Sequence, residues 1–235
     1  MYHPPTETDD NIRDEYIKLV NTSTVPIPLY DTETGIGYQF SNGVTFQFST
    51  NHIIPARGVV LVVSFDPVSD KQSLQGFMDQ YNIDEWNEKV VITGPYSGKL
   101  SNSGETLRLV KKQPLGESSI EIIIDTLTYQ DSSPWPGKAD GKGSVLQRRD
   151  LFAYADDPAN WSSKMPSPNT PLEMPELVLS WHFQNGQLVL SFTGELYEST
   201  NMKDWTPVKM DIPKADTYIV DIPQYGQKYY RIQSE

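Results

Sequence analysis

The sequence predicts an all-β fold of the sandwich or barrel type, and three observations favour it. Its apolar segments are short, and Gly, Pro, Asn or Asp interrupts them about every 8–12 residues, which is typical of such folds. Several segments alternate apolar and polar residues, as Thr106–Val110 does. Asn-Gly pairs, which favour tight hairpin turns, separate two pairs of these segments. With 235 residues, 37% of them hydrophobic, the chain can bury a core without disulfides.

The first expected strand is Glu15–Val20, which opens the apolar pattern. Leu29–Phe48 is expected to form a hairpin region, with a type I′ turn at Asn42-Gly43. Val59–Phe65 then forms a continuous apolar run. A run this short, bounded by turn residues, predicts a strand buried in the centre of the fold.

One helix is expected at about residues 67–82, inserted into the strand pattern. Asp66-Pro67 opens it, and Ser69 or Asp70 can cap its first turn. Its apolar residues recur with the period of a helix and share one face: Leu74, Phe77, Met78 and Tyr81. We expect this face to pack on the end of the sandwich, with a partner-binding surface as the alternative.

The strand pattern then returns and completes a first domain that spans residues 1–162. The further strands expected in it are Lys89–Thr93, Thr106–Lys111, Glu121–Tyr129 and Ser144–Gln147. Residues 163–176 are rich in proline and polar residues, which predicts a stiff, extended linker.

A small β module is expected at residues 177–235. Its predicted strands are Leu177–Phe183, Gln187–Phe192, Glu195–Ser199, Thr217–Ile222 and Lys228–Gln233. Asn185-Gly186 supplies a second hairpin turn. Because so short a segment can bury little core, we expect it to dock on the first domain or on another copy.

Composition excludes several classes of protein. With 19 Lys and Arg against 31 Asp and Glu, the net charge is −12, which repels a phosphate backbone, so we expect no nucleic-acid partner. The chain has no Cys, so it has no disulfide or zinc-thiolate site. No apolar run is long enough for a membrane span. The N-terminus lacks the features of a signal peptide, so we expect either a mature chain or a part of a longer one.

The sequence offers no constellation for catalysis, and we expect no enzyme, no metal and no cofactor. Its three histidines, His3, His52 and His182, show no metal-binding spacing, so each is expected to be a surface or a hydrogen-bonded histidine. No phosphate-binding loop, nucleophile elbow or D-x-D calcium pattern occurs. A pair of glycosidase carboxylates is not excluded by spacing, because such pairs are distant in sequence.

Aromatic residues are the remaining candidates for binding. Trp135 lies between two prolines in an expected loop, and Tyr96 lies near a turn. Exposed aromatic side chains can stack on sugar rings or fill pockets of a partner protein. The alternative for Trp135 is that it covers an open end of the sandwich.

An ordered series of short motifs resembles the lamin tail domain in its bacterial form. The series comprises Glu15–Asn21, Ile54–Gly58 with Leu61–Val63, Gly94–Glu105, Pro134–Pro136 and Asp157–Trp161. This resemblance covers about the first two thirds of the chain and implies an immunoglobulin-like β-sandwich. It also implies a non-catalytic module, of a kind often joined to exported enzymes or surface proteins. Because that family has a further strand before Tyr2, we expect Met1 to be an internal residue or the first strand to be missing.

The C-terminal part is similar to small β modules that end many exported bacterial proteins, in Leu196–Pro207 and Tyr229–Ile232. Together the observations predict an extracellular or cell-surface interaction or adhesion module of a larger bacterial protein. Its expected partners are a protein or a cell-surface glycan, and other domains of the same parent protein. Loops such as Asp131–Lys142 would carry the contacts. The alternative is an accessory carbohydrate-binding domain of a secreted hydrolase, with Trp135 or Tyr96 as platforms.

Overall fold

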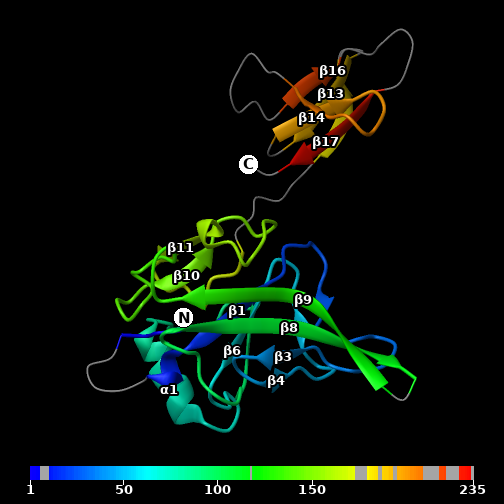
Figure 1. The fold of residues 1–235 in the computed structure, drawn as a ribbon. Helices are drawn as coiled ribbons and strands as arrows, with labels where there is room; N and C mark the ends of the chain where they lie inside the picture. Colours follow the sequence, from blue (N-terminus) through cyan, green and yellow to red (C-terminus); the bar gives the residue numbers. More distant parts are fainter. Residues whose placement is uncertain are drawn as a thin grey trace. The chain divides into compact units, whose positions relative to one another are not determined.

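The computed structural model describes residues 1–5, 11–116, 118–172, 179–184, 187–192, 195–208, 217–220 and 228–233 (Figure 1). The chain forms two compact units, Met1–Leu172 and Glu173–Glu235. Most of the described elements are strands, and the single α-helix among them lies in the first unit. The prediction of an all-β, sandwich-like fold with one inserted helix is confirmed.

The first unit is built from short strands and two long ones. Its strands are β1 (Tyr16–Val20), β2 (Ile27–Pro28), β3 (Gln39–Asn42), β4 (Phe46–Gln47), β5 (Ile53–Ile54), β6 (Val59–Val63), β7 (Val90–Thr93), β8 (Gly104–Leu115), β9 (Ser118–Gln130), β10 (Val145–Arg148) and β11 (Trp161–Lys164). They form one sheet of order β1-β6-β7, a second of order β4-β3-β8-β9, and the pairs β2-β5 and β10-β11. The helices of this unit are α1 (Lys71–Gln80) and two short 3-10 helices, η1 (Ile12–Asp14) and η2 (Pro158–Asn160).

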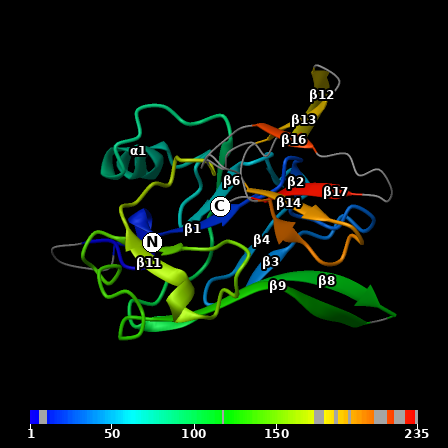
Figure 2. The same ribbon diagram turned by 90° about the horizontal axis from the view of Figure 1, so that it is seen from above.

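Strand β6 is buried on both faces, as its apolar run predicts. Because side chains alternate across a strand, Val60 and Val62 face one way and Val59, Leu61 and Val63 the other. The first pair belongs to the main core, which it shares with residues of β3, β8 and β9. The other three belong to a second core, which they share with α1. Sheet β1-β6-β7 is therefore the middle of three layers, as Figure 2 shows from above.

Helix α1 spans Lys71–Gln80, within the expected range of 67–82, because Asp70 caps it. The Asp66-Pro67 pair expected to open it lies in the turn before the helix. The Asp70 side chain accepts a hydrogen bond from the Ser73 backbone N–H at 3.0 Å. Phe77 is fully buried against Val59, Leu61 and Val63. The apolar stripe therefore packs inside the protein, but on the outer face of the β1-β6-β7 sheet rather than on the end of the sandwich. The reason is that this sheet is apolar on both faces and needs a cover on the side away from the main core.

The first predicted hairpin forms, but not with a two-residue turn. Strands β3 and β4 pair as expected, with Phe40 opposite Phe46. Asn42 lies opposite Arg108 of β8, past an irregularity in the pairing, and only Gly43 of the Asn-Gly pair has positive φ. A type I′ turn requires positive φ at both central residues, so that expectation is wrong. Pairing with β8 holds Asn42 in the strand and leaves a longer connection.

The first half of the predicted linker belongs to the first unit. Residues 163 and 164 continue β11, and Leu172 N–H donates to the carbonyl of Arg57 at 3.2 Å. The Lys18 amino group donates to the carbonyls of Ser167 and Thr170 at 2.8 and 2.7 Å. The segment is not extended throughout, because the Thr170 N–H donates to the Ser167 carbonyl at 3.3 Å and closes a turn. Residues 173–178 lie outside the described part of the chain.

The second unit contains two small sheets around its own core. One has the order β12 (Leu179–Gln184), β13 (Gln187–Phe192), β16 (Thr217–Val220), and the other β15 (Thr206–Pro207), β14 (Glu195–Ser199), β17 (Tyr229–Gln233). The buried apolar residues that cluster in this core are Leu190, Phe192, Leu196 and Val220. Strands form at each of the five predicted positions, and the short β15 was not predicted. The turn expected at Asn185-Gly186 lies outside the described residues.

Candidate binding surfaces

Tyr96, one of the two predicted binding residues, is a core residue. Its side chain is 3% exposed, and its hydroxyl donates to Glu15 Oε2 at 2.6 Å. The same oxygen accepts the backbone N–H of Leu100 at 2.9 Å. Burial, and then the nearby Glu15, raise the pKa of Tyr96 far above its usual range, so the phenol stays protonated. Tyr96 therefore satisfies a buried carboxylate and offers no face to a ligand.

Trp135, the other predicted residue, is also buried. It is 6% exposed, belongs to the main core and packs beside Trp161, with ring centroids 6.1 Å apart. The exposed platform expected at Trp135 is thus not what the structure shows. The two prolines around it do place it in a connection between strands, but that connection folds inward.

The histidines are hydrogen-bonded or on the surface, as predicted. His52 Nε2 lies 2.7 Å from Thr93 Oγ1, and its Nδ1 accepts the Ser49 N–H at 2.9 Å. His3 Nδ1 lies 2.7 Å from Asp140 Oδ1, and His182 is exposed. Among the described residues no group of three or more His, Asp or Glu is placed to hold a metal ion. In the same part of the chain, no helix combines the length and apolar character that crossing a bilayer requires.

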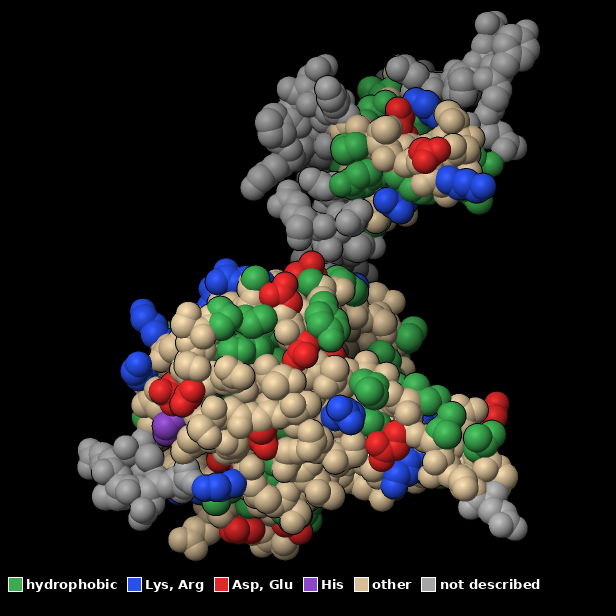
Figure 3. Space-filling model, viewed as in Figure 1, with side chains coloured by type: hydrophobic (Ala, Val, Ile, Leu, Met, Phe, Trp, Pro, Cys, Tyr) green, Lys and Arg blue, Asp and Glu red, His purple; other side chains and the backbone are tan. Residues whose placement is uncertain are grey.

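One group of exposed apolar side chains in the first unit lies on the outer ends of β8 and β9. We call Lys111–Leu115 and Ser118–Ile124 the β8–β9 arm. Its exposed apolar side chains are Leu115, Ile120, Ile122, Ile123 and Ile124. Ile123 alone is 52% exposed. Figure 3 shows hydrophobic side chains gathered over this projecting part of the unit. Exposed apolar side chains gathered in one part of a unit can mark an interaction site.

Strand β9 is an edge of its sheet, and only one half of that edge is covered. Toward its C-terminal end, Thr128 N–H donates to Asp156 Oδ1 at 2.5 Å, and Arg148 pairs with Asp125 at 2.9 Å. In contrast, Ser118–Ile124 has no hydrogen-bonded neighbour on its outer side among the residues described. The two halves meet at a β-bulge, because Asp125 lies opposite Leu109 and Ile123 opposite Val110, which leaves Ile124 unpaired.

Polar side chains accompany the apolar ones on the arm. Ile120 lies directly opposite Gln113 and Ile122 opposite Lys111, so these four side chains share one face. Glu121, on the other face, lies opposite Lys112. The arm is therefore a two-sided ribbon, with apolar and charged positions on both faces.

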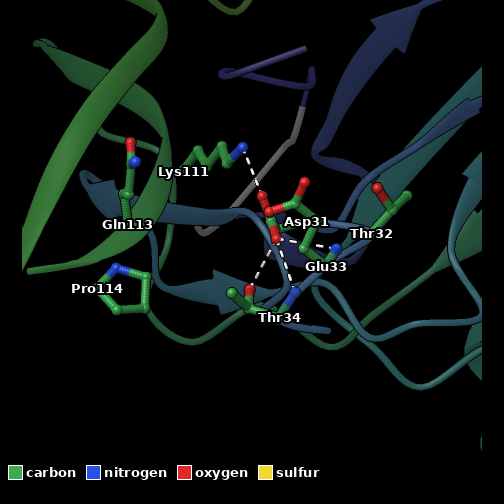
Figure 4. Close-up of a pocket in the computed structure, with 7 residues that line it drawn as sticks. All are labelled: Asp31, Thr32, Glu33, Thr34, Lys111, Gln113 and Pro114. Atoms are coloured by element: carbon green, nitrogen blue, oxygen red, sulfur yellow. Dashed lines mark hydrogen bonds and ion pairs between the residues drawn. The ribbon is translucent and has the colours of Figure 1, made fainter.

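A small polar pocket of about 420 Å³ lies against this arm. Its lining residues are Asp31, Thr32, Glu33, Thr34, Lys111, Gln113 and Pro114 (Figure 4). Asp31 accepts hydrogen bonds from the backbone N–H groups of Glu33 and Thr34, at 3.1 and 2.8 Å, and from Lys111 at 2.6 Å. The Lys111 ammonium, followed by Thr34, holds the pKa of Asp31 well below its usual range. This carboxylate is therefore a fixed anion that ties the arm to the 31–34 turn.

A second surface is the loop of residues 150–155, which presents two exposed aromatic rings. Phe152 is 72% and Tyr154 67% exposed. The side chain of Asn160 fixes the backbone of this loop, because it donates to the carbonyls of Asp150 and Tyr154 at 2.9 and 3.3 Å. Arg148 adds a hydrogen bond to the carbonyl of Ala153 at 2.9 Å. Fixed backbone and exposed rings together make a pre-organised contact surface.

The second unit also exposes aromatic side chains, on the edge strand β12. Trp181 and Phe183 are exposed and form an edge-to-face pair with centroids 6.1 Å apart. They lie opposite Leu190 and Leu188 of β13, so they share the core face of their sheet.

Sequence reasoning overlooked the arm and the aromatic loop, although signals for both were present. The run Ile122-Ile123-Ile124 breaks the alternation expected of a half-buried strand, which points either to burial on both faces or to an exposed edge with a bulge. Asp150-Leu-Phe-Ala-Tyr154 places two aromatic residues in a short connection. No family model, curated protein or solved structure matches this chain. The resemblance to the lamin tail domain accordingly stays a prediction.

Proposed function

We propose that this chain is a non-catalytic interaction module of a larger exported protein, and that its β8–β9 arm contacts another protein. The observation that carries the proposal is the free edge of Ser118–Ile124, with its exposed isoleucines. Folded proteins normally blunt such an edge, because unpaired backbone and apolar side chains invite association. Here Asp156 and Arg148 cover the neighbouring half of the same strand, and none of the described residues covers the isoleucine half in this way.

The export of the parent protein rests on the resemblance of both parts of the chain to modules of exported bacterial proteins. The interaction itself rests on surface chemistry. Burial of the arm's exposed apolar side chains against a partner would favour association, and the pairing of β8 with β9 orders the backbone in advance, which reduces the entropy cost of the contact. No step of the proposal needs a reacting group.

Site-specific photo-crosslinking tests this proposal. A benzophenone amino acid at Ile122, in the whole chain mixed with the secreted and surface proteins of the producing organism, is expected to give a discrete protein adduct. The matched control carries the same probe at Val68, which is 76% exposed and lies outside the arm. Adducts of equal yield from both positions, or none from Ile122, would refute the proposal.

A second candidate function, the accessory carbohydrate-binding domain, is favoured by the aromatic loop. Phe152 and Tyr154 replace Trp135 and Tyr96 as the platforms, because only exposed rings can stack on sugars. The test is depletion of the chain from solution by insoluble cellulose, chitin or xylan. Binding that Phe152→Ala with Tyr154→Ala abolishes, and that Val68→Ala leaves intact, supports this function. The absence of binding to all three polysaccharides counts against it.

A further inference from the structure

We infer that the arm recruits its partner by strand addition: an extended segment of a second protein pairs with the free edge of β9. The added segment carries apolar residues at alternate positions and Lys or Arg between them. The inference rests on the proposed interaction function and specifies the chemistry of its partner. It follows from the backbone, the side-chain alternation and the charge of the arm.

The backbone of Ser118–Ile124 offers a hydrogen-bonding edge of defined length. It starts at the hairpin end of β9 and stops at the bulge at Ile124. Seven residues of antiparallel strand span roughly 20–24 Å at about 3.4 Å each. Beyond the bulge the edge is closed, since Asp156 occupies the N–H of Thr128. An added strand can therefore pair with this half alone.

The side chains of the arm set the pattern of the partner. Ile120 and Ile122 share one face of β9, and Glu121 lies on the other. Residues on an added strand would lie beside these, with directly opposite side chains about 5 Å apart. Apolar residues of the partner thus meet Ile120 and Ile122, and the intervening residues meet Glu121.

Charge decides what those intervening residues are. Lys112 lies opposite Glu121, and the Gln39 side chain donates to Glu121 Oε1 at 3.4 Å. Glu121 is exposed, so its second carboxylate oxygen can still accept from a partner. Beneath the arm, Lys111 is already paired with Asp31, and Glu33 is exposed nearby. The whole chain carries a net charge of −12. A basic strand is attracted to Glu121 and to a chain of this net charge, whereas a second copy of the same acidic chain is repelled.

Two capped heptapeptides test the inference on the whole chain: one alternates lysine with valine, and the other glutamate with valine. We expect the lysine peptide to bind at least tenfold more tightly by fluorescence anisotropy at low salt. When this peptide binds, the NMR chemical shifts of the protein's backbone amides are expected to change within Ser118–Ile124. Glu121→Lys should reverse the preference between the peptides. Ile120→Lys with Ile122→Lys should abolish binding of both, and Val68→Lys should leave the affinities unchanged.

Several results would overturn strand addition. These are equal affinity for the two peptides, shift changes outside the arm, or peptide binding that survives the double lysine variant with its circular dichroism spectrum intact. If the double variant does not fold, the reversal by Glu121→Lys decides. Concentration-dependent dimerisation that Glu121→Lys alters would identify a second copy as the occupant and overturn the basic partner. A crosslink from Ile122 without peptide binding would leave the interaction function standing and remove strand addition alone.

Discussion

Replacing Tyr96 by Phe removes one oxygen atom from the buried network around Glu15. The Tyr96 hydroxyl donates to Glu15 Oε2 at 2.6 Å, in a site where both side chains are almost fully buried. After the change this oxygen keeps the N–H of Leu100 but loses the hydroxyl of Tyr96. Leaving a buried polar group short of a partner costs about 1–3 kcal/mol.

The expected effect is large enough to measure. The first unit has 172 residues, from Met1 to Leu172. For that size, 1 kcal/mol lowers the midpoint of thermal unfolding by about 2–4 °C, so a loss of about 2 kcal/mol lowers it by about 4–8 °C. Differential scanning calorimetry of the whole chain would report it. The control is Tyr154→Phe, which removes the same atom from an exposed ring and is expected to stay within about 0.5 kcal/mol of the parent. Equal effects of the two substitutions would refute the assignment of Tyr96 to the core.

Two further perturbations test other parts of the fold. Phe77→Ala should reduce the free energy of unfolding by about 3–5 kcal/mol, because the fully buried ring packs α1 against β6. Denaturant titration measures this loss, with Val68→Ala as the control at an exposed position. A loss below about 1 kcal/mol for Phe77→Ala would contradict the prediction. Burial lowers the pKa of His52, so between its folded pKa and about 6.5 the unfolded state binds more protons and stability rises with pH. Urea titrations from pH 5 to pH 7.5 should show this rise, and His52→Gln should flatten it. A rise of the same size in the variant would contradict the assignment to His52.

Elements with a strong local signal could be predicted from the sequence. The Val59–Val63 run, the cap of α1 at Asp70 and the alternating strands all appear where the pattern places them. Each depends on interactions that the sequence displays directly, namely side-chain period and capping. The prediction of a type I′ turn at Asn42-Gly43 was wrong, because the pairing of β3 with β8 overrode the local preference of these two residues. That pairing joins Asn42 to Arg108, 66 positions further along the chain.

The binding residues could not be predicted for a related reason. Whether an aromatic ring in a loop faces water depends on what the loop packs against, and that is a property of distant segments. Tyr96 turns inward because Glu15, 81 positions away, needs a donor. Trp135 turns inward toward Trp161. Phe152 and Tyr154 stay outside because Asn160 uses the backbone of their loop and leaves their rings free.

Strand β6 has a consequence for how the first unit comes apart. Its alternate residues complete the main core on one side and the core under α1 on the other. If α1 detached, Val59, Leu61 and Val63 of β6 would be exposed to water, and this would destabilise the same strand that supplies Val60 and Val62 to the main core. The two cores cannot therefore melt one after the other, and the unit is expected to lose its structure in a single cooperative transition. Hydrogen exchange should then give the amides of α1 and of β6 the same high protection.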